Sequence, residues 1–163
     1  MAAAEKPGEF ETRLNVTYAT HDSVALAGDL YLPKGAGPFP ALVAVHGGGW
    51  VQGARNAFQY WGPWLAARGY AVFAISYRLA KTGQKTFPHA VQDVLAGIQY
   101  VRGNAKELNV APDRIGLFGH SAGGNLSALA ALGGSLALVP SLGTEFLPEL
   151  NEGSVWVSCD LPT

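Results

Sequence analysis

The stretch GLFGHSAGG, residues 116–124, decides the fold, because it sets a serine between two glycines at the junction of two predicted elements. Residues 114–119 form a short apolar run typical of a buried strand, and residues 122–132 are typical of a helix. Residues 119–123 fit the G-x-S-x-G pattern, in which a sharp strand-to-helix turn exposes the serine hydroxyl. The pattern predicts that Ser121 is a nucleophile, the alternative being an incidental turn serine.

A second glycine-rich motif, His46-Gly47-Gly48-Gly49-Trp50, follows another apolar run at residues 41–45. Glycines leave the backbone N–H groups bare, so those of Gly47 and Gly48 are suited to bind a developing negative charge on an ester oxygen. The N–H of Ala122, directly after the serine, would complete this oxyanion hole. The alternative is a turn that needs glycine only for its backbone angles.

The segments around these motifs alternate between strand and helix patterns. Polar and apolar residues alternate over 13–20 and 24–33, which predicts an antiparallel pair of strands. Further along the chain we expect a helix at 58–69, a buried strand at 70–78, and a helix after Pro88. The apolar face of this last helix is expected to carry Val91, Leu95, Ile98, and Val101 or Arg102. This order predicts an α/β fold with a mostly parallel, doubly wound sheet.

Composition excludes several classes of function. Eleven basic and twelve acidic residues give the 163-residue chain a formal charge of −1, with no basic block for a nucleic acid. We expect no membrane span, because no apolar stretch is long enough, and no signal peptide, so a cytoplasmic location. The single cysteine, Cys159, cannot form an internal disulfide, and no ligand spacing indicates a metal site.

Several segments resemble one family. DLYLP (29–33), HGGGW (46–50), SYRLA (76–80), FPHAVQDV (87–94) and DRIGLFGHSAGGNL (113–126) are similar to the N-terminal part of α/β-hydrolase serine esterases of the hormone-sensitive-lipase-like and feruloyl or carbohydrate esterase type. The resemblance covers about Asn15 to Leu132. It implies hydrolysis of small-molecule carboxylic esters without a cofactor, with Ser121 as nucleophile and Gly47, Gly48 and Ala122 as oxyanion hole.

The resemblance also implies an acid and a histidine on later strands, yet residues 122–163 contain no histidine. We therefore expect a truncated α/β-hydrolase that lacks its C-terminal strands, with a partial hydrolase domain at 1–133 and an unrelated or irregular tail at 134–163. Residues 138–157 resemble a segment of heavy-metal efflux pumps of the resistance-nodulation-division class, which implies a junction of two coding sequences near Gly133 to Leu136. A pump fragment is disfavoured, because no spanning helix is expected.

Two functions stay open. The first is an esterase acting on short-chain soluble esters, since no lid segment is visible, with activity impaired by the missing acid and histidine. The second is a non-catalytic fragment that at most binds acyl compounds.

The chain contains four histidines and two aspartates that are candidates for the missing base or acid. His89 is the best local substitute, because it is expected on the side of the sheet where the strands end. For the other histidines we expect non-catalytic roles: His46 forms a structural hydrogen bond, His120 packs or lines the pocket, and His21 faces solvent in the hairpin turn. Asp93 is expected to decorate the helix after Pro88, and Asp160 belongs to the tail.

The strand at 114–119 is expected to lie at an unprotected sheet edge, because the later strands of the resembled fold are not encoded. Such an edge invites another strand. Either residues 154–161 dock there, or a second copy of the chain covers the edge and forms a homo-oligomer.

Overall fold

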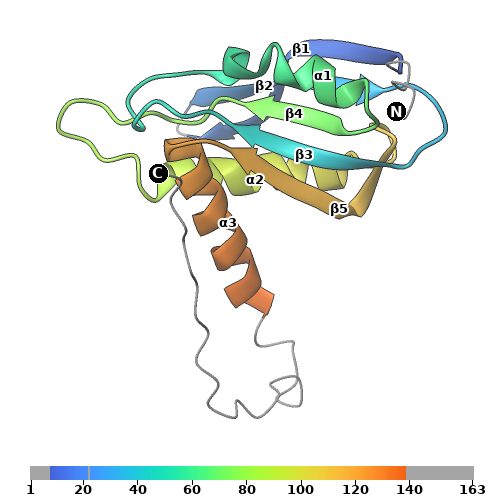
Figure 1. Ribbon diagram of the computed structural model, residues 1–163. Coiled ribbons are helices and arrows are strands. Elements are labelled where there is room, and N and C mark those ends of the chain that lie inside the picture. The colour runs from blue at the N-terminus through green and yellow to red at the C-terminus, as the bar shows by residue number, and fades with distance from the viewer. Residues whose placement is uncertain (1–7, 22, 139–163) are drawn as a thin grey trace, which may run out of the picture.

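The computed structural model describes residues 8–21 and 23–138, which form one five-stranded sheet with helices on both faces (Figure 1). The strands are β1 (Phe10–His21), β2 (Val24–Pro33), β3 (Phe39–Val45), β4 (Ala71–Ile75) and β5 (Val110–Gly119). Their spatial order is β1-β2-β4-β3-β5. β1 pairs antiparallel with β2 and β2 antiparallel with β4, whereas β3 pairs parallel with both β4 and β5. The predicted hairpin and α/β fold are confirmed.

The helices divide between the two faces of the sheet. The 3-10 helix η1 (Arg55–Phe58) and helix α1 (Trp61–Ala66) follow β3 and cover one face, as Figure 1 shows. Helices α2 (His89–Gly103) and α3 (Ala122–Leu138) contact each other and cover the other face. None of the helices in the described part of the chain is long and apolar enough to span a membrane.

Each face has its own core, because successive side chains of a strand point to opposite faces. Val43, Val45, Phe73 and Ile75 belong to the larger core under α2 and α3. Their neighbours Ala44, Val72 and Ala74 belong to the smaller core under η1 and α1, with Phe58 and Ala66. The apolar runs of β3 and β4 are therefore buried on both faces, as a parallel sheet between helices requires.

The expected helix at 58–69 is wrong in its extent. Pro63 has no N–H and its ring clashes with the carbonyl four residues earlier, so a helix that contains it can begin only shortly before it. Helix α1 accordingly begins at Trp61, and Phe58 belongs to the separate 3-10 turn. The chain leaves the helix through Gly69 at a φ of +84°.

Other boundaries differ as well, since β1 begins at Phe10 rather than at residue 13 and β5 at Val110 rather than at residue 114. β4 ends at Ile75 rather than at residue 78, because the N–H of Arg78 bonds the carboxylate of Asp93 instead of a strand. Helix α3 continues to Leu138, past the expected end at 132 and through residues 133–135, where composition predicts a domain boundary. That boundary, and the domains 1–133 and 134–163, remain predictions.

The buried stripe of α2 is shifted by about one residue from the predicted one. Ala90, Val94 and Gly97 are buried, and so is Val101, as expected, whereas Val91, Leu95 and Ile98 lie partly buried beside the stripe. Arg102 is exposed.

Candidate active site

The carboxyl ends of the three parallel strands, β3, β4 and β5, lie side by side. Val45 of β3 is paired with Ile75 of β4 on one side and with Gly119 of β5 on the other. The segments that begin at His46 and His120 therefore start side by side. β4 lies on one side of β3, and β5, which follows β4 in the chain, lies on the other side. Open α/β sheets bind ligands where the strand order reverses in this way.

The turn between β5 and α3 is too tight for side chains at its two glycines. A Cβ atom on Gly123 would lie 2.0 Å from the carbonyl oxygen of Val45, and one on Gly119 would lie 2.7 Å from the backbone of Gly123. Ser121 has a φ of +52°, a left-handed conformation that is strained for a residue with a Cβ. Its side chain is exposed, and its carbonyl accepts the N–H of Asn125 at 3.0 Å as α3 begins. The sequence motif therefore forms the strained, exposed turn that it predicts.

The glycine loop after β3 packs directly on this turn. A Cβ on Gly47 would lie 2.9 Å from Nε2 and 3.0 Å from the carbonyl oxygen of His120. Gly48 has a φ of +119°, and a Cβ there would lie 2.1 Å from the carbonyl oxygen of Gln52. The carbonyl of Gly48 accepts the N–H groups of Val51 and Gln52, each at 3.2 Å. The loop is thus a closed turn held beside the residue that precedes Ser121.

The N–H groups of this loop are available. Within the described residues, no protein group accepts a hydrogen bond from the N–H of Gly47 or Gly48. Ala122 is the first residue of α3, where the N–H has no partner inside the helix. The N–H groups of Gly47 and Gly48 lie on the glycine loop and that of Ala122 lies at the start of α3, and the two segments are in contact through Gly47 and His120.

His46 is a buried, neutral support for the loop. Its Nδ1 lies 2.7 Å from the carbonyl oxygen of Gly47, which makes it a donor there, and its ring stacks on Tyr77 at 4.3 Å. The hydroxyl of Tyr77 donates to the carbonyl of His46 at 3.1 Å. Burial lowers the pKa of His46 below its ordinary value, because the charged form loses its solvation. The predicted structural hydrogen bond of His46 is confirmed.

His89 and His120 lie in different surroundings. His120 packs on Gly47 and has its ring centroid 6.4 Å from that of Phe58. His89 is exposed at the start of α2, its Nδ1 lies 3.4 Å from Oε1 of Gln92, and it lines a cavity of about 780 Å³. In the described part of the chain no hydrogen bond joins His89 to Ser121, so its role as substitute base stays a prediction.

Asp93 was expected on the exposed side of α2, but it is fully buried. Its carboxylate accepts the backbone N–H of Arg78 at 2.8 Å and the Nη2 of the same residue at 2.7 Å. A buried carboxylate needs such partners, and the partner was not visible in the local sequence. His21 does not simply face solvent either, since its Nε2 is buried 4.0 Å from Oδ1 of Asp93.

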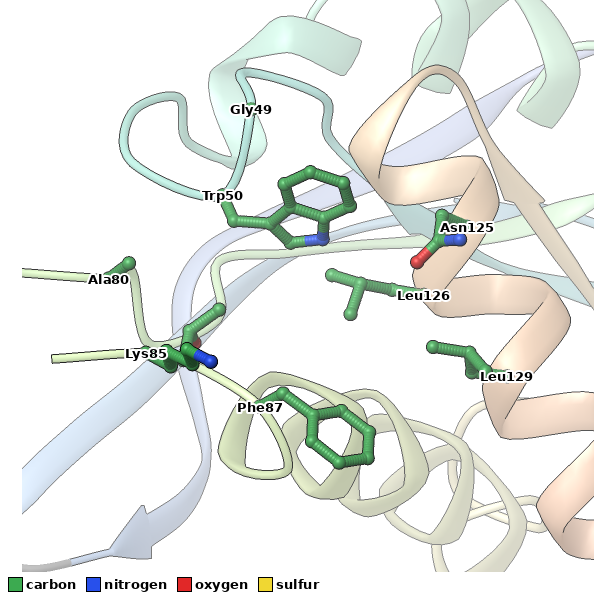
Figure 2. Close-up of a pocket in the computed structure, with 9 residues that line it drawn as sticks. Gly49, Trp50, Ala80, Lys85, Phe87, Asn125, Leu126 and Leu129 are labelled. Carbon is green, nitrogen blue, oxygen red and sulfur yellow. The ribbon is translucent and has the colours of Figure 1, made fainter.

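A pocket of about 300 Å³ opens between the glycine loop and helix α3. Figure 2 shows Trp50 across from Asn125 and Leu126 of α3, with Phe87 and Leu129 nearer the α2 side. Sequence reasoning missed this pocket. Its signal was the tryptophan that ends HGGGW, together with the spacing of Asn125 and Leu129, which puts both on one face of α3. No group of three metal-ligating side chains occurs in the described ranges.

Comparison with known proteins gives the family. Residues 28–155 match the BD-FAE family. The chain belongs to the BD-FAE family. It is 34% identical over 113 residues to an acetylxylan esterase of Xylanibacter ruminicola, and 38% identical over 98 residues to the carboxylesterase NlhH of Mycobacterium tuberculosis. These matches cover 68% and 56% of this chain, but only 23% and 28% of the relatives.

Solved esterases share the fold of this BD-FAE chain. The thermostable carboxylesterase EstE1 from a metagenomic library matches with a TM-score of 0.71 and 35% identity. The hyperthermophilic esterase of the archaeon Pyrobaculum calidifontis matches with a TM-score of 0.67 and 30% identity. The matches cover 83% and 81% of this chain, and 45% and 41% of the other chains. The chain therefore spans less than half the length of both structures, and its predicted α/β-hydrolase fold is confirmed.

The BD-FAE match also bears on the tail. It extends to residue 155 and so overlaps most of residues 138–157. The predicted likeness of that segment to an efflux pump, the strand expected at 154–161, Cys159 and Asp160 lie outside the described residues, and the likeness stays a prediction.

Proposed function

We propose that this chain hydrolyses carboxylic esters with Ser121 as nucleophile and the N–H groups of Gly47, Gly48 and Ala122 as oxyanion hole. One observation carries the proposal: Gly47 packs so closely on His120 that its Cβ position lies 2.9 Å from Nε2 of that residue. Gly47 is thus in contact with the residue directly before the exposed serine, which supports a role for the loop N–H groups in binding the ester oxygen. The esterases among the relatives and solved structures support the same reaction class.

The chemistry follows from this arrangement. The Oγ of Ser121 forms a bond to the ester carbonyl carbon, its proton passes to a base, and the carbonyl oxygen becomes negative. The N–H groups of Gly47, Gly48 and Ala122 bind that oxygen, aided by the positive end of α3. The carbon–oxygen bond to the alcohol then breaks, the alcohol takes the proton, and water releases the acid from the serine. No cofactor enters this sequence.

The base is the open element. Residues 122–163 contain no histidine, so within the chain the proposed base is His89. We expect Ser121→Ala to abolish hydrolysis of 4-nitrophenyl butyrate, and His89→Ala to lower it only if His89 serves as base. Added imidazole, with the rate of Ser121→Ala subtracted, should raise the rate of the wild-type chain if a base is lacking. Equal rates for wild type and Ser121→Ala under every condition would refute the nucleophile.

We propose short-chain soluble esters as substrates, because the pocket beside the glycine loop holds only about 300 Å³. The test is a series of 4-nitrophenyl acetate, butyrate, octanoate and laurate. The value of kcat/KM should fall toward the long acyl chains. A rate that rises toward emulsified long-chain substrates would contradict this assignment.

The second candidate is a non-catalytic fragment that binds acyl compounds. The observation that favours it is that, within residues 8–21 and 23–138, no histidine side chain forms a hydrogen bond with the hydroxyl of Ser121. This candidate predicts that butyrate esters bind equally to wild type and Ser121→Ala, with no turnover by either protein. Titration followed by NMR distinguishes it from the esterase.

We also propose that the free edge of β5 is covered by residues 154–161 or by a second copy of the chain. Among the described strands β5 pairs only with β3, and Phe118 on it is 37% exposed. Deletion of residues 134–163 should increase the size measured by light scattering and speed hydrogen exchange at 114–119. A truncated chain that stays monomeric and exchanges slowly would show that the edge needs no cover.

A further inference from the structure

A second cavity adjoins the pocket beside the glycine loop. It has a volume of about 780 Å³ and lies between the start of β2 and the segment 76–89 that joins β4 to α2. The two cavities share Ala80, Lys85 and Thr86 in their walls. Lys85 therefore lies where the two cavities adjoin. Figure 2 shows Lys85 across the smaller pocket from Asn125 and Leu129 of α3.

The walls of both cavities carry positive charge only. Residues 71–92 contain Arg78, Lys81 and Lys85 and no acidic residue, although the chain as a whole has a charge of −1. No aspartate or glutamate lines either cavity, and Arg55 is a further cation in the larger one. The charge of this region thus has the opposite sign to that of the whole chain.

Two of these four cations are already neutralised. Arg55 Nε lies 2.9 Å from Oδ1 of Asp29, and Arg78 Nη2 lies 2.7 Å from Oδ1 of Asp93. Lys81 and Lys85 form no ion pair with any carboxylate in the described residues. The two lysines therefore supply the net positive charge that an incoming group encounters.

The segment that carries the lysines is anchored to the fold. The N–H of Gln84 bonds the carbonyl of Lys81 at 2.8 Å and closes a turn between the two lysines. The hydroxyl of Thr86 donates to the carbonyl of Arg78, which is itself held by the buried Asp93. The lysines are thus presented from a segment fixed at both ends, which reduces the entropy lost when a ligand binds them.

We propose that the ester hydrolysed by this chain carries a carboxylate, and that Lys85 binds this carboxylate at the boundary of the two cavities, with Lys81 beyond it. The proposal rests on the esterase function proposed above. The apolar walls formed by Trp50, Leu126 and Leu129 take the carbon chain next to the ester, and the lysine takes the charge at its far end. Lys85 is accordingly a residue that determines substrate choice and has no part in bond breaking.

The first test measures selectivity. The ratio of kcat/KM for mono-4-nitrophenyl adipate to kcat/KM for 4-nitrophenyl hexanoate compares acyl chains of equal carbon number with and without a carboxylate, after subtraction of spontaneous hydrolysis. Lys85→Met should lower this ratio by about twofold to fivefold, the range measured for exposed charge pairs. Lys106→Met removes the same charge near the opposite edge of the sheet, shortly before β5 begins, and should leave the ratio unchanged. Added salt should lower the wild-type ratio.

The carboxylate can lie on the acid or on the alcohol side of the ester. A second pair, 4-carboxyphenyl butyrate and 4-carbamoylphenyl butyrate, places the charge on the alcohol side. The two leaving groups differ in reactivity, but this difference cancels when the ratio is compared between wild type and variant. The pair whose ratio falls in Lys85→Met identifies the side that faces the lysine. If neither ratio changes in Lys85→Met, or if Lys106→Met changes them as much, the proposal is wrong.

A binding measurement separates this proposal from the esterase function. Saturation-transfer NMR on the Ser121→Ala protein compares monomethyl adipate with methyl hexanoate. Preferential binding of monomethyl adipate, lost in Ser121→Ala/Lys85→Met and kept in Ser121→Ala/Lys106→Met, supports the lysine site even if no ester is turned over. Equal binding of the two esters to Ser121→Ala overturns it even if 4-nitrophenyl hexanoate is hydrolysed.

Discussion

Replacement of Gly123 with alanine tests the packing that joins the two halves of the candidate site. The added Cβ would lie 2.0 Å from the carbonyl oxygen of Val45 and 2.6 Å from that of His46. An ordinary contact needs about 3.4 Å, so β3 and the start of α3 must separate by about 1.4 Å. Both sides of the contact are backbone, so no side-chain rotation relieves it.

The expected cost follows from this overlap. Overpacking of a closely packed site costs about 1–3 kcal/mol and sometimes more, and alanine returns at most about 1 kcal/mol through its higher helix propensity. We expect Gly123→Ala to lower the free energy of unfolding by about 2 kcal/mol. Gly124→Ala is the matched control, because its Cβ would have a nearest contact of 3.3 Å, to the carbonyl oxygen of Gly119. This control should be neutral or stabilised.

Urea unfolding followed by circular dichroism measures both variants, and hydrolysis of 4-nitrophenyl butyrate reports on the site. Gly123→Ala should also lose activity, since displacement of α3 moves Ser121 away from the N–H groups of Gly47 and Gly48. If Gly123→Ala unfolds at the same urea concentration as the wild type and keeps its activity, the close packing of the glycine loop on the turn is refuted.

Three further outcomes are expected. Asp93→Asn should destabilise the fold by about 3 kcal/mol in urea unfolding, because it removes the buried negative charge that faces the guanidinium of Arg78; the exposed Asp113→Asn should change little, and equal effects would contradict the buried pair. Since burial lowers the pKa of His46, the unfolded chain binds a proton that the folded chain does not, so stability should fall as pH drops below about 6.5; His46→Asn should lack this part of the pH dependence, and an unchanged pH profile would show that His46 titrates normally. Tyr18→Phe should cost about 1 kcal/mol through loss of the hydrogen bond to the carbonyl of Ser76, measured in the same way, whereas no loss would mean that this bond does not contribute.

The sequence predicted the elements whose pattern is local. The strand at 24–33, the apolar run at 41–45 and the tight glycines around Ser121 each reflect the immediate surroundings of the backbone, and the structure contains all three. The strand at 24–33 is however buried on both faces over residues 28–33, which its alternation does not predict. The glycine motifs were informative because close backbone contacts exclude every other residue. The positions of both loops at one sheet edge then followed from parallel pairing.

The remaining features depend on partners that are distant in sequence. Asp93 is polar and was placed on the surface, but its partner Arg78 lies 15 residues earlier, on a segment with no periodic pattern. The pocket required Trp50 and Leu129 to meet, which depends on how α3 crosses the sheet. The shortened helix α1 was predictable in principle, because Pro63 limits where a helix can begin.

The candidate nucleophile and oxyanion hole come from two strands that are direct neighbours, β3 and β5. Ala44 is paired with Phe118 and Val45 with Gly119, immediately before each loop begins. The hydrogen bonds between these two strands therefore set the distance between the two loops. A graft of this site into another parallel sheet would therefore have to carry residues 39–53 and 110–125 together, with their register intact. A host sheet whose own third strand presents a histidine at the same edge would supply the base.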